Sequence, residues 1–116
     1  MSFATEPLQI ISRVLPGRVT MIVRGECDLD TAPQLGHAIA DRLSNGPSTT
    51  LYLDLSGVSF MDSSGLQAML LGQRMARLLG GELVLTGTSR QVDRLLSVTG
   101  VKFATDVRPA ASTATA

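Results

Sequence analysis

The chain has little aromatic surface and no excess of charge of either sign. Its 116 residues include no tryptophan, one tyrosine and three phenylalanines, and ten basic residues balance ten acidic ones. Such a balance supplies no field to attract nucleic acid or an anionic membrane, and platforms for stacking bases are missing. We therefore expect no nucleic-acid partner, no membrane partner, and a core built from aliphatic side chains.

Cysteine is nearly absent, and long apolar runs are absent. Cys27 is the only cysteine, so no internal disulfide can form, which is typical of a reducing compartment. No apolar stretch approaches the roughly 20 residues that span a bilayer, and the first residues do not resemble a signal peptide. These features favour a cytoplasmic protein.

The motifs of common enzyme classes are missing too. The sequence contains no Gly-x-Ser-x-Gly elbow, no Walker loop and no Gly-x-Gly-x-x-Gly fingerprint. Its only histidine, His37, falls inside an expected helix, and together with Cys27 it is too little for a zinc site. Asp28, Asp30 and Asp62 offer carboxylates to Mg²⁺, but loop solvation and helix capping explain them better. We predict no metal, no resident cofactor and no catalytic residue, and hence no enzyme.

The hydrophobic pattern instead predicts strands that alternate with helices in one domain. Strands are expected at 8–14, 18–24, 50–55, 82–86 and 101–104, and helices from 31–33 to 44, from 63 to 79 and from 90 to about 100. The turn pair Pro16-Gly17 indicates a hairpin, and the nearly continuous apolar run at 18–24 indicates a strand covered on both faces. The resulting fold class is α/β, order β-β-α-β-α-β-α-β, with a mostly parallel or mixed sheet of four to five strands.

Helix caps and core positions follow from the same pattern. Thr31 and Ser89 are expected to cap the first and third helices through their hydroxyls. The expected core contacts of the first two helices are Leu35, Ile39 and Leu43, then Leu66, Met69, Leu70 and Leu78.

Two acid-bearing loops, 26–30 and 58–64, should leave neighbouring strand ends and enter helices. In parallel sheets function gathers at the carboxyl ends of strands, so the two loops should meet at one rim. The second loop leads into Asp62-Ser63-Ser64-Gly65, where the helix dipole and free N–H groups favour an anion. By itself this motif is more typical of a helix cap, formed by Asp62 or Ser63.

Two segments resemble the signatures of STAS domains, specifically of bacterial anti-sigma factor antagonists. They are residues 25–35 (GECDLDTAPQL) and residues 53–66 (LDLSGVSFMDSSGL), at the expected separation. The resemblance covers residues 8–104, and the predicted domain is 1–108, with 109–116 as a disordered tail. Two departures are Cys27, where the family usually has an aliphatic residue, and the absence of a helix-forming sequence over 110–116, where a fourth helix is usual.

The resemblance implies a partner-switching module of transcription regulation, acting in a stress response. An antagonist of this family binds an anti-sigma factor, itself a serine kinase, and thereby frees a sigma factor. The kinase phosphorylates a serine that matches Ser64 here, with Ser63 as the second candidate, and so inactivates the antagonist. Asp28 and Asp62 match the two loop acids near the kinase, and Met61, Ser63 and Gly65 complete the expected partner-binding surface. ATP and Mg²⁺ would belong to the kinase, and the chain itself would be a monomer or weak dimer.

Charge near Ser64 predicts how a phosphate would act. No Arg or Lys lies between Ser56 and Gln73, and Arg74 is ten residues beyond Ser64, or about 15 Å along the helix. A phosphate of about −1.5 to −2 charges would therefore stay exposed and block a surface. Two alternatives stay open: a STAS subunit of an ABC-type lipid transport system, and, as the third, an anion- or nucleotide-binding enzyme.

Overall fold

Strands and helices alternate along the part of the chain that the computed structural model describes, residues 7–44, 46 and 48–106. The elements are β1 (Gln9–Leu15), β2 (Arg18–Cys27), α1 (Ala32–Leu43), β3 (Thr50–Met61), α2 (Ser63–Leu78), β4 (Glu82–Thr88), α3 (Arg90–Thr99) and β5 (Ala104–Thr105). This order confirms the predicted α/β class and the predicted succession of elements.

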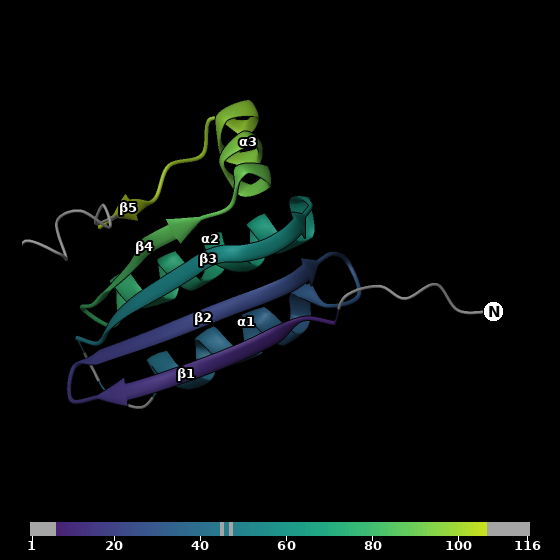
Figure 1. Cartoon of the computed structure of the whole chain (residues 1–116). Helices are drawn as coiled ribbons and strands as arrows, with labels where there is room; N and C mark the ends of the chain where they lie inside the picture. Colours follow the sequence, from purple (N-terminus) through teal and green to yellow (C-terminus); the bar gives the residue numbers. More distant parts are fainter. Residues whose placement is uncertain (1–6, 45, 47, 107–116) are drawn as a thin grey trace, which may run out of the picture.

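The five strands form one mixed sheet, and they lie in it in the same order as in the chain, β1-β2-β3-β4-β5 (Figure 1). β1 runs antiparallel to β2, as the Pro16-Gly17 turn predicts, and every other neighbouring pair is parallel. A parallel arrangement places the carboxyl ends of β2, β3 and β4 on the same side of the sheet, where the chain turns into the three helices.

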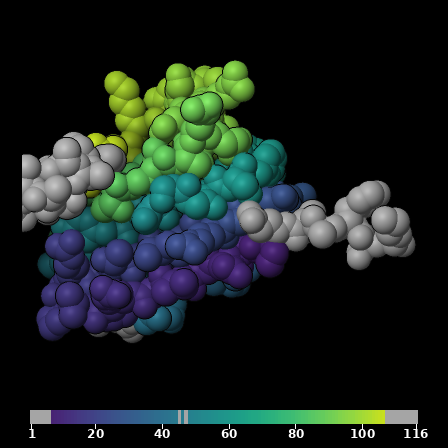
Figure 2. Space-filling view, in the orientation of Figure 1, coloured from purple at the N-terminus to yellow at the C-terminus, as the bar shows by residue number. Residues whose placement is uncertain are grey.

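Two of the helices cover one face of the sheet. α1 and α2 lie behind the strands in Figure 1, and α3 lies on the β4 side near the carboxyl end of β3. Along β3, Leu51, Leu53 and Leu55 are fully buried beneath the helices, while the residues between them are half-buried on the opposite face. β2 shows the same alternation, so the expectation of a strand covered on both faces is wrong. Figure 2 shows this second face, where side chains of β1, β2 and β3 form the surface.

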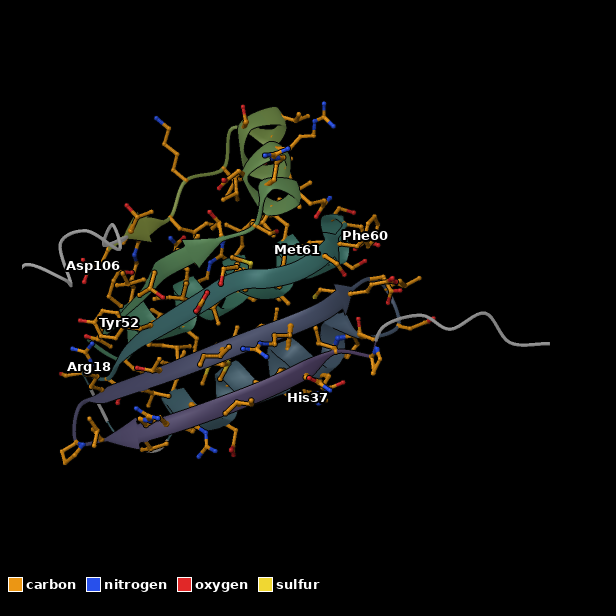
Figure 3. All side chains as sticks on the ribbon, in the orientation of Figure 1. Arg18, His37, Tyr52, Phe60, Met61 and Asp106 are labelled. Carbon is orange, nitrogen blue, oxygen red and sulfur yellow. The ribbon has the colours of Figure 1, made fainter. Side chains whose placement is uncertain are left out.

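One aromatic contact lies on the second face. The guanidinium carbon of Arg18 lies 4.2 Å from the ring centroid of Tyr52, a cation–π geometry (Figure 3). The parallel register pairs Thr20 with Tyr52, so Arg18 reaches the ring from the adjacent strand.

The core is aliphatic, as the scarcity of aromatic residues predicts. Its helix contributions include Leu35, Ile39 and Leu43 from α1 and Leu66 and Met69 from α2, all buried, which confirms those positions. Leu70 is half-buried. Leu78 is 80% exposed, so its assignment to the core is wrong. Ala76 is the last buried residue of α2, and Leu78 lies about 200° around the helix from it, pointing away from the sheet.

Strands β2 and β3 are longer than the sequence pattern predicts. β2 continues to Cys27, and β3 continues through residues 56–61, most of a segment expected to be a loop. The two extensions pair with each other, with register shifts between Ile22 and Arg24 and between Gly25 and Glu26. The irregular register explains the error, because it interrupts the period-2 alternation that identifies a strand.

Some predictions lie outside the described residues. The disordered tail at 109–116 and the lack of a fourth helix over 110–116 are among them, so they remain predictions. In the described ranges, no helix is long and apolar enough to cross a membrane.

We expect Leu53→Ala to lower the free energy of unfolding by about 2–5 kcal/mol, since it leaves a cavity among fully buried side chains. Leu78→Ala removes the same atoms from an exposed position and should change stability by about 0.5 kcal/mol or less. Urea unfolding of both variants tests this, and equal losses would contradict the assignment of the core.

Candidate functional site

The ends of β2 and β3 are tied together where α2 begins. Cys27 pairs with Met61 in the parallel register, and the next backbone N–H, that of Asp62, donates to the carbonyl oxygen of Cys27 at 3.2 Å. Figure 3 places Phe60 and Met61 at this end of β3. The predicted meeting of the two acid-bearing segments at one rim is therefore confirmed, although both loops are shorter than expected.

Asp62 caps α2 with its carboxylate. Its Oδ1 accepts hydrogen bonds from the backbone N–H of Ser64 at 2.9 Å and of Gly65 at 3.4 Å, and its own backbone is extended. The cap satisfies two of the free N–H groups of the first turn and places a negative charge at the positive end of the helix dipole. This confirms the cap predicted from the sequence, with Asp62 as the residue that forms it.

The two serines after Asp62 have different surroundings. Ser63 is exposed, whereas Ser64 is half-buried and lines a groove of about 460 Å³ between α1 and α2. Within the described residues the Ser64 hydroxyl makes no hydrogen bond, so its oxygen is available for chemistry. Because α2 turns about 100° per residue, adjacent serines must face different directions, and only Ser64 faces α1.

Gly65 lets the first turn of α2 approach the end of β2 closely. A Cβ at residue 65 would lie 2.7 Å from Met61 Cγ, 2.8 Å from Cys27 Sγ and 3.2 Å from the Cys27 carbonyl oxygen. These distances are shorter than ordinary contacts, so a side chain would push the helix away from the strands. Glycine at this position thus sets the place of Ser64.

Asp28 organises the entry to α1. Its Oδ1 accepts from the backbone N–H of Asp30 at 3.0 Å and of Thr31 at 3.1 Å. Thr31 does not cap α1 through its hydroxyl, so that prediction is wrong: the hydroxyl donates to the Glu26 carbonyl oxygen at 2.8 Å and accepts from the Asp28 N–H at 3.0 Å. The extra strand residues of β2 bring Glu26 within reach of Thr31, which the sequence pattern does not reveal.

Gln91 is a positioning residue that sequence reasoning missed. Its Oε1 accepts from the Met61 N–H at 2.7 Å, and its Nε2 donates to the Met61 carbonyl oxygen at 3.1 Å. This double hydrogen bond joins α3 to the last residue of β3, directly before Asp62. A glutamine in the first turn of an amphipathic helix carries no signal of such a contact, so only the tertiary structure shows it.

Cys27 lies beneath the rim as a buried, protonated thiol. The pKa of Cys27 is raised to about 11, chiefly by burial and in addition by the nearby carboxylates of Asp62 and Asp28. Both acids therefore lie near the Cys27 thiol. A thiol with this pKa is unreactive near neutral pH.

Metal-ligand clusters are absent from the described part of the chain: no three His, Cys, Asp or Glu side chains there are arranged to hold an ion. His37 is exposed on α1 and lines the groove with Ser64. The arrangement provides a hydroxyl, two neighbouring carboxylates and a groove, which are features of a recognition surface.

Comparisons with known proteins agree with this geometry. A family model described as "Mlab, STAS domain" matches residues 13–103. The chain is 33% identical over 91 residues to an anti-sigma-B factor antagonist of Listeria monocytogenes, and the match covers 78% of each chain.

Solved structures show the same fold. The chain is similar to an anti-sigma factor antagonist from Mycobacterium paratuberculosis, with a TM-score of 0.78, 24% identity and coverage of 97% of this chain and 95% of that one. It is also similar to the phosphorylated form of the Bacillus cell fate determinant SpoIIAA, with a TM-score of 0.69, 22% identity and coverage of 93% and 96%.

We expect Gly65→Ala to destabilise the protein by about 1–3 kcal/mol, because the added methyl group overpacks the contact with Cys27. Gly36→Ala is the matched control, since its Cβ would lie 3.9 Å from Ala68 Cβ in ordinary contact. Removing glycine from a helix interior should stabilise by about 0.5–1 kcal/mol. Urea unfolding should thus show a lower free energy of unfolding for Gly65→Ala and a higher one for Gly36→Ala. An unchanged free energy of unfolding for Gly65→Ala would contradict the close approach of α2 to Cys27.

Stability should fall as the pH rises above 9.0. The ordinary pKa of the Cys27 thiol is 9.0 and its folded pKa is about 11, so the stabilisation is complete below pH 9.0 and is lost as the pH rises through about 11. Unfolding free energies measured across this window should fall more steeply for the wild type than for Cys27→Ala. Parallel pH profiles of the two proteins would show that folding does not shield the Cys27 thiol from ionisation.

Proposed function

The chain belongs to the STAS-domain family, among the anti-sigma factor antagonists, and we propose that it binds an anti-sigma factor that is itself a serine kinase. In this proposal binding frees a sigma factor, and phosphorylation of Ser64 by the kinase ends the binding. Asp28, Asp62 and Ser63 form the surrounding partner-binding surface, while Met61 and Gly65, predicted as part of it, are buried beneath it and hold it in place. Support comes from the relative's name and from the position of Ser64.

The observation that carries the proposal is the Ser64 hydroxyl, half-buried and without a hydrogen bond in the described structure. It lies in the first turn of α2 and lines the groove between α1 and α2. The core therefore does not oppose the modification, and no buried group has to move to expose the oxygen.

Asp62 decides how the phosphate would act. The N–H groups that usually bind an anion at a helix start, those of Ser64 and Gly65, already donate to the Asp62 carboxylate. A phosphate on Ser64 would meet a like charge there instead of free donors. It would therefore remain at the surface, and the folded structure would change little.

Blocking a surface is sufficient for a switch. Opposed or desolvated like charge in an interface costs several kcal/mol, and each 1.4 kcal/mol lowers affinity about tenfold. One phosphate at the centre of the interface would thus weaken binding by orders of magnitude without unfolding the antagonist.

We expect the anti-sigma kinase of the source organism, with ATP and Mg²⁺, to phosphorylate Ser64, as mapped by mass spectrometry. Ser64→Ala should bind the kinase and accept no phosphate. Ser64→Asp should bind the kinase with an affinity lowered about a hundredfold or more. Ser63→Ala is the control, and it should be phosphorylated like the wild type.

Phosphate on Ser63, or unchanged binding by Ser64→Asp, would overturn the assignment of the site. Absence of any kinase binding, with co-purification of a membrane permease, would favour the alternative transport subunit over the antagonist.

A further inference from the structure

The groove between α1 and α2 extends from Ser64 along the outside of the helix layer. Residues Ala32 to Ala40 of α1 and Ser64 to Gly72 of α2 line its two sides. Each stretch covers nine residues, which extend about 12 Å along the helix. The lining residues His37, Gln67 and Leu71 are exposed, so the groove opens to solvent. The two helices that form it lie behind the sheet in Figure 1.

Small residues along the seam make the groove. Gly36 faces Ala68, where an added Cβ would be in ordinary contact at 3.9 Å, and a Cβ at Gly72 would lie only 2.7 Å from Ile39 Cγ2. Because Gly36, Ala68 and Gly72 add little bulk at the seam, a trough remains above it. Two large apolar side chains border it: Leu29 is 75% exposed and Leu71 is 58% exposed.

The trough carries no fixed charge. Among the described residues that line it there is no Asp, Glu, Lys or Arg, and His37 is the only titratable one. A complementary surface must therefore be apolar and uncharged along two helical turns. An amphipathic helix that presents apolar residues at i, i+3 or i+4, and i+7 meets this requirement.

The groove is continuous with the phosphorylation site of the proposed function. Ser64 lines one end of the groove, and its backbone N–H donates to Asp62, which caps α2. A kinase that transfers phosphate to the Ser64 oxygen must approach this end of the groove. The partner that phosphorylates Ser64 is thus the molecule whose surface is already placed over the groove.

We propose that the groove is the docking site for an amphipathic helix of the anti-sigma kinase, and that phosphate on Ser64 prevents docking by bringing a charge into an uncharged trough. This inference rests on the proposed function, and it assigns the binding surface to the α1–α2 groove in addition to the loops that carry Asp28 and Asp62. The phosphate would then act on the groove as much as on the loops.

Two pairs of exposed substitutions test the groove. Leu71→Ser removes an apolar border residue, and Leu78→Ser makes the same change on the same helix beyond the groove. Gln67→Glu places a negative charge inside the groove with almost no change in the shape of the side chain. Gln9→Glu makes the same change on β1. All four positions are exposed, so the fold should persist, which thermal unfolding verifies.

Affinity for the full-length anti-sigma kinase of the source organism should be measured by calorimetry. Leu71→Ser and Gln67→Glu should each weaken binding about tenfold or more, and both controls should bind like the wild type. If Ser64→Asp loses binding while Leu71→Ser and Gln67→Glu retain it, the groove proposal is wrong and the proposed function stands. If the unmodified wild type binds no such kinase, the proposed function fails, and the groove proposal fails with it.

Discussion

The first turn of α2 packs against the end of β2 because residue 65 has no side chain. Gly65 lies over Cys27, the Asp62 N–H donates to the Cys27 carbonyl oxygen, and the Asp62 carboxylate accepts from the next N–H groups. These contacts give α2 one position relative to the strands. The direction of Ser64, the depth of the groove and the burial of Cys27 all depend on that position.

At the same junction, the Asp62 carboxylate and the Ser64 hydroxyl have different roles. The Asp62 carboxylate occupies the helix N–H groups and so serves the fold, whereas the Ser64 hydroxyl has no structural hydrogen bond among the described residues. A helix start that already holds one anion offers little to a second. A new charge there therefore acts on whatever approaches the surface and leaves the backbone in place.

Much of this could be predicted from the sequence, and the errors have physical causes. Helical periodicity identified Leu35, Ile39 and Leu43 as core, since a regular helix repeats its contacts. The assignment of Leu78 to the core failed because this residue lies about 200° around α2 from Ala76, on the side away from the sheet. The hydroxyl of Thr31 donates to the Glu26 carbonyl oxygen on β2, so it does not cap α1 as the local rule predicts. Gln91 gave no signal, because its partner Met61 is 30 residues away in the chain.

The sequence by itself determined the α/β order, a helix cap at Asp62 or Ser63 and the serine pair after Asp62, because these depend on contacts among neighbouring residues. Only the tertiary structure decided which serine faces a groove, how far β2 and β3 extend and which face of the sheet stays uncovered. Those features depend on the register between two strands and on the approach of two helices. Both are set by packing between segments distant in the chain, which no local pattern of residues encodes.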